Sequence, residues 1–229
     1  MAHVLDLPGC CVRATSRDEA IRRLPEAIRE YHAWLENHGA GGDLPAAEIE
    51  IVVAEEIHGT GPFDPGDAAG FFTPDRMLVT TAEMEDYFRL MTYSRSDLLS
   101  VINDLPASAL DWQPEAKSFS IRRTLRHIGN AEEWYVSRLL PPEKLPHEWN
   151  DDDQLPILDF LDMERRTALD CLRQLTEIER SQVFYPTCWT EHPEEPWSLR
   201  KVLRRFLEHE CEHTNQICSL LAGWQIQER

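Results

Sequence analysis

Apolar residues recur every three or four positions through most of the chain beyond residue 80. This spacing is typical of amphipathic helices, in which one stripe faces the core and the rest faces solvent. It predicts four long helices, at residues 81–103, 118–139, 156–180 and 197–222. Four such helices indicate a helical bundle. The connection at 140–155 is long enough to cross the bundle, which favours a crossover over a tight hairpin.

The first 57 residues follow a different pattern. Two short apolar segments flank a Leu-Pro-Gly turn signal at 7–9 and predict a pair of strands. A helical period then runs from 16 to about 38, and the β-branched run at 48–55 predicts another strand. Together these elements indicate a small ββαβ unit.

The sequence therefore predicts an α+β protein. The ββαβ unit takes up residues 1–57, residues 58–80 form a linker rich in Gly and Pro, and a four-helix bundle with a crossover connection spans 81–229. Because 42% of its 229 residues are hydrophobic, the chain has enough apolar material for a sizeable core.

The charge balance limits the choice of partners. The chain has 23 Lys and Arg against 41 Asp and Glu, which gives a net charge of −18. A protein this acidic repels phosphate backbones and anionic membranes. We therefore expect neither nucleic acid nor a membrane as a partner.

Signals that would direct the chain out of the cytoplasm are missing from the sequence. The N-terminus lacks the basic start and long apolar segment of a signal peptide, and no run approaches the ~20 apolar residues of a membrane helix. The six cysteines show neither C-x-x-C spacing nor a disulfide framework, which is typical of reduced thiols. We expect a cytoplasmic protein.

Three histidines carry the strongest chemical signal. His209 and His213 are four residues apart on the last predicted helix, so they share one face at the edge of its apolar stripe. His127 has the same edge position on the second predicted helix. If the two helices pack together, three imidazoles meet and can bind one divalent metal, such as zinc, nickel or iron. The alternative is that they are core histidines satisfied by ordinary hydrogen bonds.

Two carboxylates accompany the histidines on the inward faces. Glu210 lies within the apolar arc of the last helix, and Glu132 lies beside Leu125 on the second. An inward carboxylate needs a partner because an isolated buried charge is very costly. Each could orient a ligand histidine or act as a base; the alternative is a buried salt bridge. Glu208 and Glu212 fall on the opposite side, where we expect them to be solvated.

The run His209-Glu210-x-x-His213 also matches the H-E-x-x-H motif of zinc proteases. That motif needs a third ligand further along the chain. The segment after His213 contains no histidine, and its only acidic side chain is Glu228. A metalloprotease is therefore disfavoured.

The segments 120–135 and 207–217, with Trp112 and Trp197 near the starts of their helices, resemble the DinB-like family of four-helix bundle metalloproteins. The order of one histidine on the second helix and an H-x-x-x-H pair on the last carries the resemblance. It implies that His127, His209 and His213 bind one divalent metal, commonly zinc or nickel, in a protein that is often a homodimer. Several relatives are transferases or isomerases that use a low-molecular-weight thiol.

Residues 5–11 and 15–28 resemble a HicB-like antitoxin domain, which implies partner binding or self-association. Two functional hypotheses follow. In the first, the protein is a metal-dependent thiol S-transferase or isomerase that acts on a small-molecule substrate. In the second, it is a non-catalytic interaction or sensor protein whose HicB-like domain mediates dimerisation or partner binding.

Overall fold

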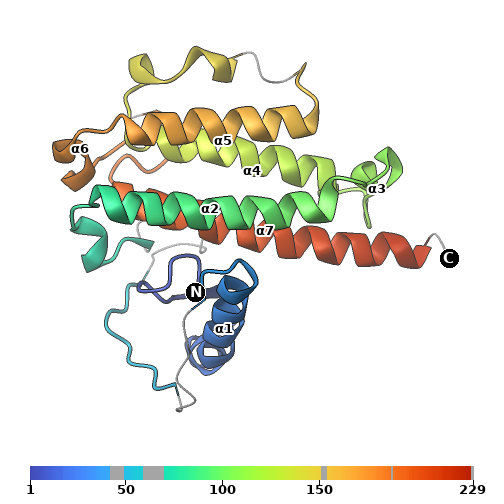
Figure 1. Ribbon diagram of the computed structural model, residues 1–229, viewed down its shortest axis with the longest axis horizontal. Coiled ribbons are helices and arrows are strands. Elements are labelled where there is room, and N and C mark those ends of the chain that lie inside the picture. Colours follow the sequence, from blue (N-terminus) through green and yellow to red (C-terminus); the bar gives the residue numbers. More distant parts are fainter. Residues whose placement is uncertain (42–48, 59–69, 151–153, 187, 228–229) are drawn as a thin grey trace.

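The computed structural model describes residues 1–41, 49–58, 70–150, 154–186 and 188–227. Within them, four long helices lie side by side as a bundle (Figure 1). These helices are α2 (Thr81–Ile102), α4 (Ile121–Val136), α5 (Ile157–Arg173) and α7 (Leu199–Gln227). Helix α7 packs against both α2 and α4, and α4 packs against α5. The predicted four-helix bundle is confirmed.

The long connection between α4 and α5 crosses the bundle, as predicted. Both helices run in the same direction, so the chain returns along the length of the bundle between them (Figure 1). Two short 3₁₀ turns, η3 (Pro142–Lys144) and η4 (His147–Asn150), lie in this connection. A tight hairpin would have made α4 and α5 antiparallel.

Capping residues correct two predicted helix boundaries. Helix α4 begins only after Ser120, whose hydroxyl accepts a hydrogen bond from the Arg123 amide. The helix predicted at 156–180 is two helices: α5 ends at Arg173, and α6 (Glu177–Ser181) begins after Thr176. Thr176 and Glu179 form a reciprocal capping box, which starts a new helix where the apolar period continues unbroken. A short helix that was not predicted, α3 (Ala107–Asp111), precedes α4.

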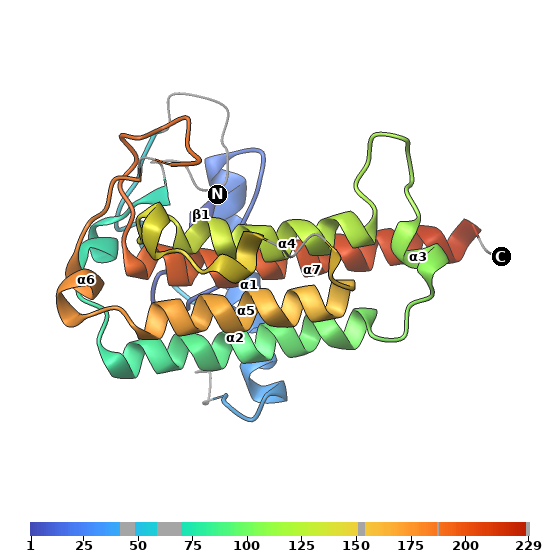
Figure 2. The same ribbon diagram turned by 90° about the horizontal axis from the view of Figure 1, so that it is seen from above.

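The N-terminal unit, defined here as residues 1–38, lies against one side of the bundle, next to α7 and α2 (Figures 1 and 2). Strands β1 (Ala2–His3) and β2 (Cys11–Val12) form an antiparallel pair, and α1 (Arg17–Asn37) follows. The Ser16 side chain caps α1 by accepting from the Glu19 amide.

The strand predicted at 48–55 is absent from its described part, residues 49–55, so the unit is ββα rather than ββαβ. Strands of two residues offer only a short edge for a third strand to pair with. Of the apolar run, Ile51 packs on the small core of the unit, whereas Val52 is 77% exposed and Val53 46% exposed. The β-branched pattern at 48–55 therefore predicted a strand that does not form in the described residues 49–55.

A layer of charged side chains divides the bundle core. One apolar cluster includes Met91, Tyr135 and Phe206, and the other includes Leu98 and Phe160. Between the two clusters, buried charged side chains from all four long helices form ion pairs with one another. This charged layer consists of Arg95 on α2, Glu132 on α4, Arg165 on α5 and Glu210 on α7.

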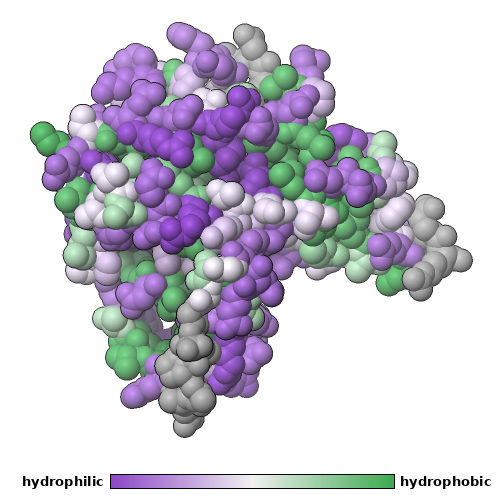
Figure 3. All heavy atoms as spheres, in the orientation of Figure 1, coloured by the Kyte–Doolittle hydropathy of each residue, from purple (hydrophilic) through white to green (hydrophobic). Residues whose placement is uncertain are grey.

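The surface view in Figure 3 is mostly hydrophilic, as the net charge of −18 leads one to expect. In the described ranges, every helix is too short or too polar to cross a membrane.

Candidate metal centre

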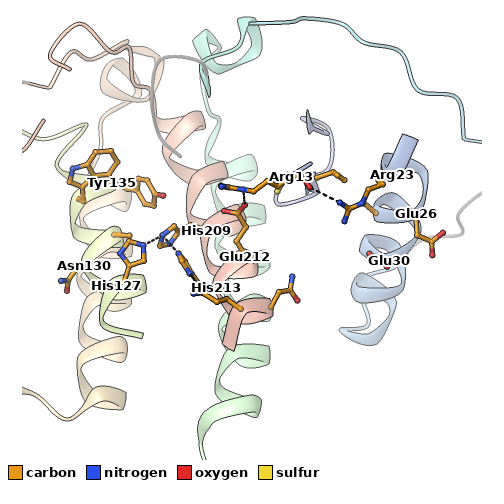
Figure 4. Close-up of a pocket in the computed structure, with 17 residues that line it drawn as sticks. Arg13, Arg23, Glu26, Glu30, His127, Asn130, Tyr135, His209, Glu212 and His213 are labelled. Carbon is orange, nitrogen blue, oxygen red and sulfur yellow. Dashed lines mark hydrogen bonds and ion pairs between the residues drawn. The ribbon is translucent and has the colours of Figure 1, made fainter. Parts of the chain in front are cut away.

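The three histidines meet at one point between α4 and α7 (Figure 4). His209 Nε2 lies 3.0 Å from His127 Nε2 and 3.1 Å from His213 Nε2. All three potential ligand atoms lie within 4.8 Å of one another. The predicted convergence of these imidazoles is confirmed.

A glycine allows α4 to take its place in the bundle. A Cβ atom at Gly129 would lie 2.3 Å from the Phe160 ring on α5, which is far inside van der Waals contact. Gly129 therefore lets the buried Phe160 ring lie directly on the α4 backbone. Because Gly129 is two residues from His127, this close packing also determines where that imidazole lies.

Burial keeps the three imidazoles in the uncharged form. Burial has the largest effect on His209, and together with the neighbouring His213, His127 and Arg205 it lowers the pKa of that ring to about 2. Burial likewise lowers the pKa values of His127 and His213. At neutral pH each ring can therefore offer a lone pair, which metal ligation requires.

Gln216 orients one of the rings. Its Oε1 lies 2.8 Å from His213 Nδ1, and a carbonyl oxygen can only accept, so Nδ1 carries the proton. The proton on Nδ1 leaves Nε2 free to face the other two histidines. Such outer hydrogen bonds fix the tautomer and orientation of metal-binding imidazoles.

We expect Gln216→Ala to weaken metal binding about tenfold, because losing a tautomer-fixing partner costs about 10- to 100-fold and this one is exposed. Competition with a chromogenic chelator measures the affinity. Gln216→Glu keeps an acceptor at the same place and should retain the affinity. Equal affinity of Gln216→Ala and the wild-type protein would contradict a role for this hydrogen bond.

The histidines open into a cavity of about 1010 Å³ between the bundle and the N-terminal unit. His127 is exposed, His213 is half-buried and His209 lies at the base, 7% exposed. The bundle side of the cavity is lined by His127, Asn130, Ala131, Trp134, Tyr135, His209, Glu212, His213, Asn215 and Gln216. The opposite side, called here the N-terminal wall, consists of Cys11, Val12, Arg13, Arg23, Glu26, Ala27 and Glu30.

Glu132 and Glu210 lie in the charged layer and are absent from the cavity lining. Arg165 donates to Glu132 at 2.7 and 2.9 Å and to Glu210 at 3.1 Å. Arg95 donates to Glu210 at 2.6 Å and also to Glu132. Glu132 and Glu210 therefore form buried salt bridges, which was one of the alternatives that the sequence left open.

The expectation that Glu208 is solvated is wrong, because the residue is 1% exposed. It lies 2.6 Å from His3 Nδ1 and accepts from Arg204 and Arg205 at 3.1 and 2.8 Å. Burial would raise the pKa of Glu208, but the charge of Arg204, the contact with His3 and the charge of Arg205 outweigh it and hold the pKa well below its ordinary value. The cause is the N-terminal unit, which covers this side of α7.

Glu212, expected to be solvated as well, is half-buried and lines the cavity. It accepts from Arg13 Nε at 3.1 Å. The N-terminal unit is thus tied to α7 one turn beyond the contact between His3 and Glu208.

A second contact holds the N-terminal unit to α2. Trp34 Nε1 donates to Asp97 at 2.6 Å, and His38 Nε2 lies 3.1 Å from the same carboxylate. The His38 ring also stacks on Tyr93, with centroids 4.4 Å apart. Sequence reasoning missed this contact and the N-terminal wall, since no periodic pattern links residues so far apart in the chain.

The chain combines a four-helix bundle with one histidine on α4 and an i,i+4 histidine pair on α7, a group of side chains that could hold a metal ion. The chain belongs to the DinB superfamily, whose family model matches residues 90–217. The matched region contains all three histidines and excludes the N-terminal unit.

Among solved structures, the chain is similar to YfiT from Bacillus subtilis, described as a probable metal-dependent hydrolase with an unusual four-helix bundle topology. The identity is 15% and the TM-score 0.47, and the match covers 64% of this chain and 90% of that chain. No curated protein matches the chain. The HicB-like resemblance stays a prediction.

Proposed function

We propose that this protein is a metal-dependent enzyme that acts on a small molecule, with His127, His209 and His213 as the metal ligands. The observation that carries the proposal is the meeting of three uncharged imidazoles at the base of a large cavity. Ligand nitrogens around a tetrahedral metal with bonds of about 2.0–2.1 Å lie about 3.3 Å apart. The observed separations of 3.0 and 3.1 Å are close to this value.

Three protein ligands are typical of catalytic sites, which keep a coordination position open. A divalent metal bound here would supply a Lewis acid that lowers the pKa of a water or thiol. The chain's own residues shape the surroundings: Tyr135 and Trp134 form an apolar side of the cavity, and Glu212 with Arg13 forms a polar one. A cavity of this kind orients a substrate and limits its contact with bulk water.

We further propose S-transfer or isomerisation with a low-molecular-weight thiol as the reaction. Membership of the DinB superfamily supports this choice, together with a cavity large enough for a thiol and a second substrate. We assign Glu132 and Glu210 the role of positioning α4 and α7, because both carboxylates are held by arginines. Water as the attacking group is the competing reaction at the same site.

Metal analysis of protein purified without chelators tests the proposal. We expect about one equivalent of a divalent transition metal, zinc or nickel, in the wild-type protein. His209→Ala should lose it, because two imidazoles alone bind weakly. His192→Ala, which removes an exposed histidine outside the cavity, should keep it. Less than about half an equivalent of metal in the wild-type protein, or full retention of metal by His209→Ala, would contradict the proposed metal site.

A further inference from the structure

We propose that the N-terminal wall selects the ligand of the cavity by charge, and that this ligand is a zwitterionic molecule of peptide size. Its carboxylate binds Arg23 and its ammonium group binds Glu30, while a third group faces the histidines. The inference rests on the proposed metal site, which supplies the opposite end of the binding cavity.

The N-terminal wall is an addition to the family's site. The family model matches residues 90–217, so the bundle side of the cavity is shared with the superfamily and the N-terminal wall is not. Arg23, Glu26, Ala27 and Glu30 recur at helical spacing, which places them on one face of α1. In Figure 4 α1 lies across from the histidines, with Arg23 extended toward Arg13 and the Glu26 carboxylate pointing away.

Two of the four charged residues of the N-terminal wall are already paired. Arg13 pairs with Glu212 at 3.1 Å, and Glu26 pairs with Arg29 at 3.3 Å. Arg23 and Glu30 make no ion pair within 4.0 Å in the part of the chain that the structure describes. The cavity therefore keeps one cation and one anion available to a ligand.

A backbone contact holds the cation in place. Arg23 Nη1 donates to the Arg13 carbonyl oxygen at 3.1 Å, which ties the guanidinium to the backbone just after β2. The remaining N–H groups of a guanidinium form a fork that suits a carboxylate. The Arg23 side chain is thus partly ordered before a ligand arrives, which lowers the entropy lost on binding.

The spacing of the two charges determines the size of the ligand. Arg23 and Glu30 are seven positions apart, or about 10 Å along α1 at about 1.5 Å per residue. A single amino acid is too short to reach both. A cavity of about 1010 Å³ lies at the upper end of small-molecule sites and can hold a molecule the size of a tripeptide.

The test uses four probes of equal length and the zinc-loaded full-length protein. Each probe is a tripeptide with a hydroxamate, a metal-binding group, on its central side chain. The termini are both free, acetylated at the amine only, amidated at the carboxylate only, or capped at both ends. Isothermal titration calorimetry measures each affinity with zinc and after zinc removal.

We expect wild-type protein to bind the probe with two free termini about fivefold more tightly than either singly capped probe. A partly exposed ion pair is worth about 1 kcal/mol, which corresponds to about fivefold. Arg23→Gln should abolish the effect of amidation only, and Glu30→Gln the effect of acetylation only. Arg22→Gln and Glu36→Gln change exposed α1 residues outside the N-terminal wall and should keep both effects.

The outcomes separate this inference from the proposed function. Zinc-dependent binding with equal affinity for all four probes would overturn charge selection and leave the metal site intact. A charge preference that persists in Arg23→Gln and Glu30→Gln would overturn the assignment to these residues. No binding of any probe, or binding that does not depend on zinc, would overturn this inference, while the metal content of wild-type protein and His209→Ala still decides the metal site.

Discussion

Replacing Arg165 by methionine is expected to lower the free energy of unfolding by about 3–5 kcal/mol, the usual cost of removing one partner from a buried ion network. Burial alone would lower the pKa of Arg165, but the charges of Glu132 and Glu210 outweigh it and raise the pKa. Without Arg165, Arg95 would be the one cation left in the charged layer to balance Glu132 and Glu210. Urea unfolding followed by circular dichroism measures the loss.

The neighbouring residue provides a matched control for this prediction. Arg166 is exposed and pairs with Asp162, itself exposed, so Arg166→Met should change stability by less than about 0.5 kcal/mol. Adding Glu132→Gln to Arg165→Met removes one of the uncompensated charges and should recover part of the loss. Similar unfolding curves for Arg165→Met and Arg166→Met would show that the charged layer adds little to stability.

Replacing Glu208 by glutamine is expected to lower the free energy of unfolding by about 3 kcal/mol, because a buried carboxylate that neutralises Arg204 and Arg205 is lost. Since Glu208 also contacts His3, the N-terminal unit should loosen first. Limited proteolysis monitors that step, and urea unfolding measures the whole change. Glu212→Gln, one turn further on and paired with the exposed Arg13, should cost less than about 1 kcal/mol.

The Glu208 carboxylate also makes the stability of the protein depend on pH. Its pKa is lowered in the folded protein, so below the unfolded value of about 4.3 the unfolded chain binds the proton more readily. The stabilisation is therefore complete above that pH and is lost as the pH falls further. Wild-type protein should lose stability more steeply than Glu208→Gln between about pH 4.3 and pH 3. Parallel pH profiles of the two proteins would contradict this account.

The helical pattern predicted the bundle well because each long helix buries a continuous apolar stripe. It placed the ends of helices less well, since capping decides them: Thr176 and Glu179 start α6 inside a run that keeps its apolar period. The i,i+4 spacing of His209 and His213 is a local property of one helix, so the pair could be predicted. His127 followed because its helix shows the same edge position.

The surroundings of the site could not be predicted in the same way. The contact of His3 with Glu208 joins residues 205 positions apart, and neither residue stands out in its own segment. Glu208 was expected to be solvated because a helix was assumed to bury one face. Residues 201–210 of α7 are buried on every side, by α2, α4, the 3₁₀ turn Thr73–Arg76 and the N-terminal unit.

The charged layer also fixes how the helices are aligned along their axes. Two apolar helix faces can shift along each other at a modest cost in free energy, because the shift only exchanges one apolar contact for another. A slip of α7 by one turn, about 5.4 Å, would carry Glu210 away from Arg95 and Arg165 and into an apolar cluster. The same slip would separate His209 from His127. The helix alignment that keeps Glu132 and Glu210 paired with arginines therefore also keeps the three imidazoles together.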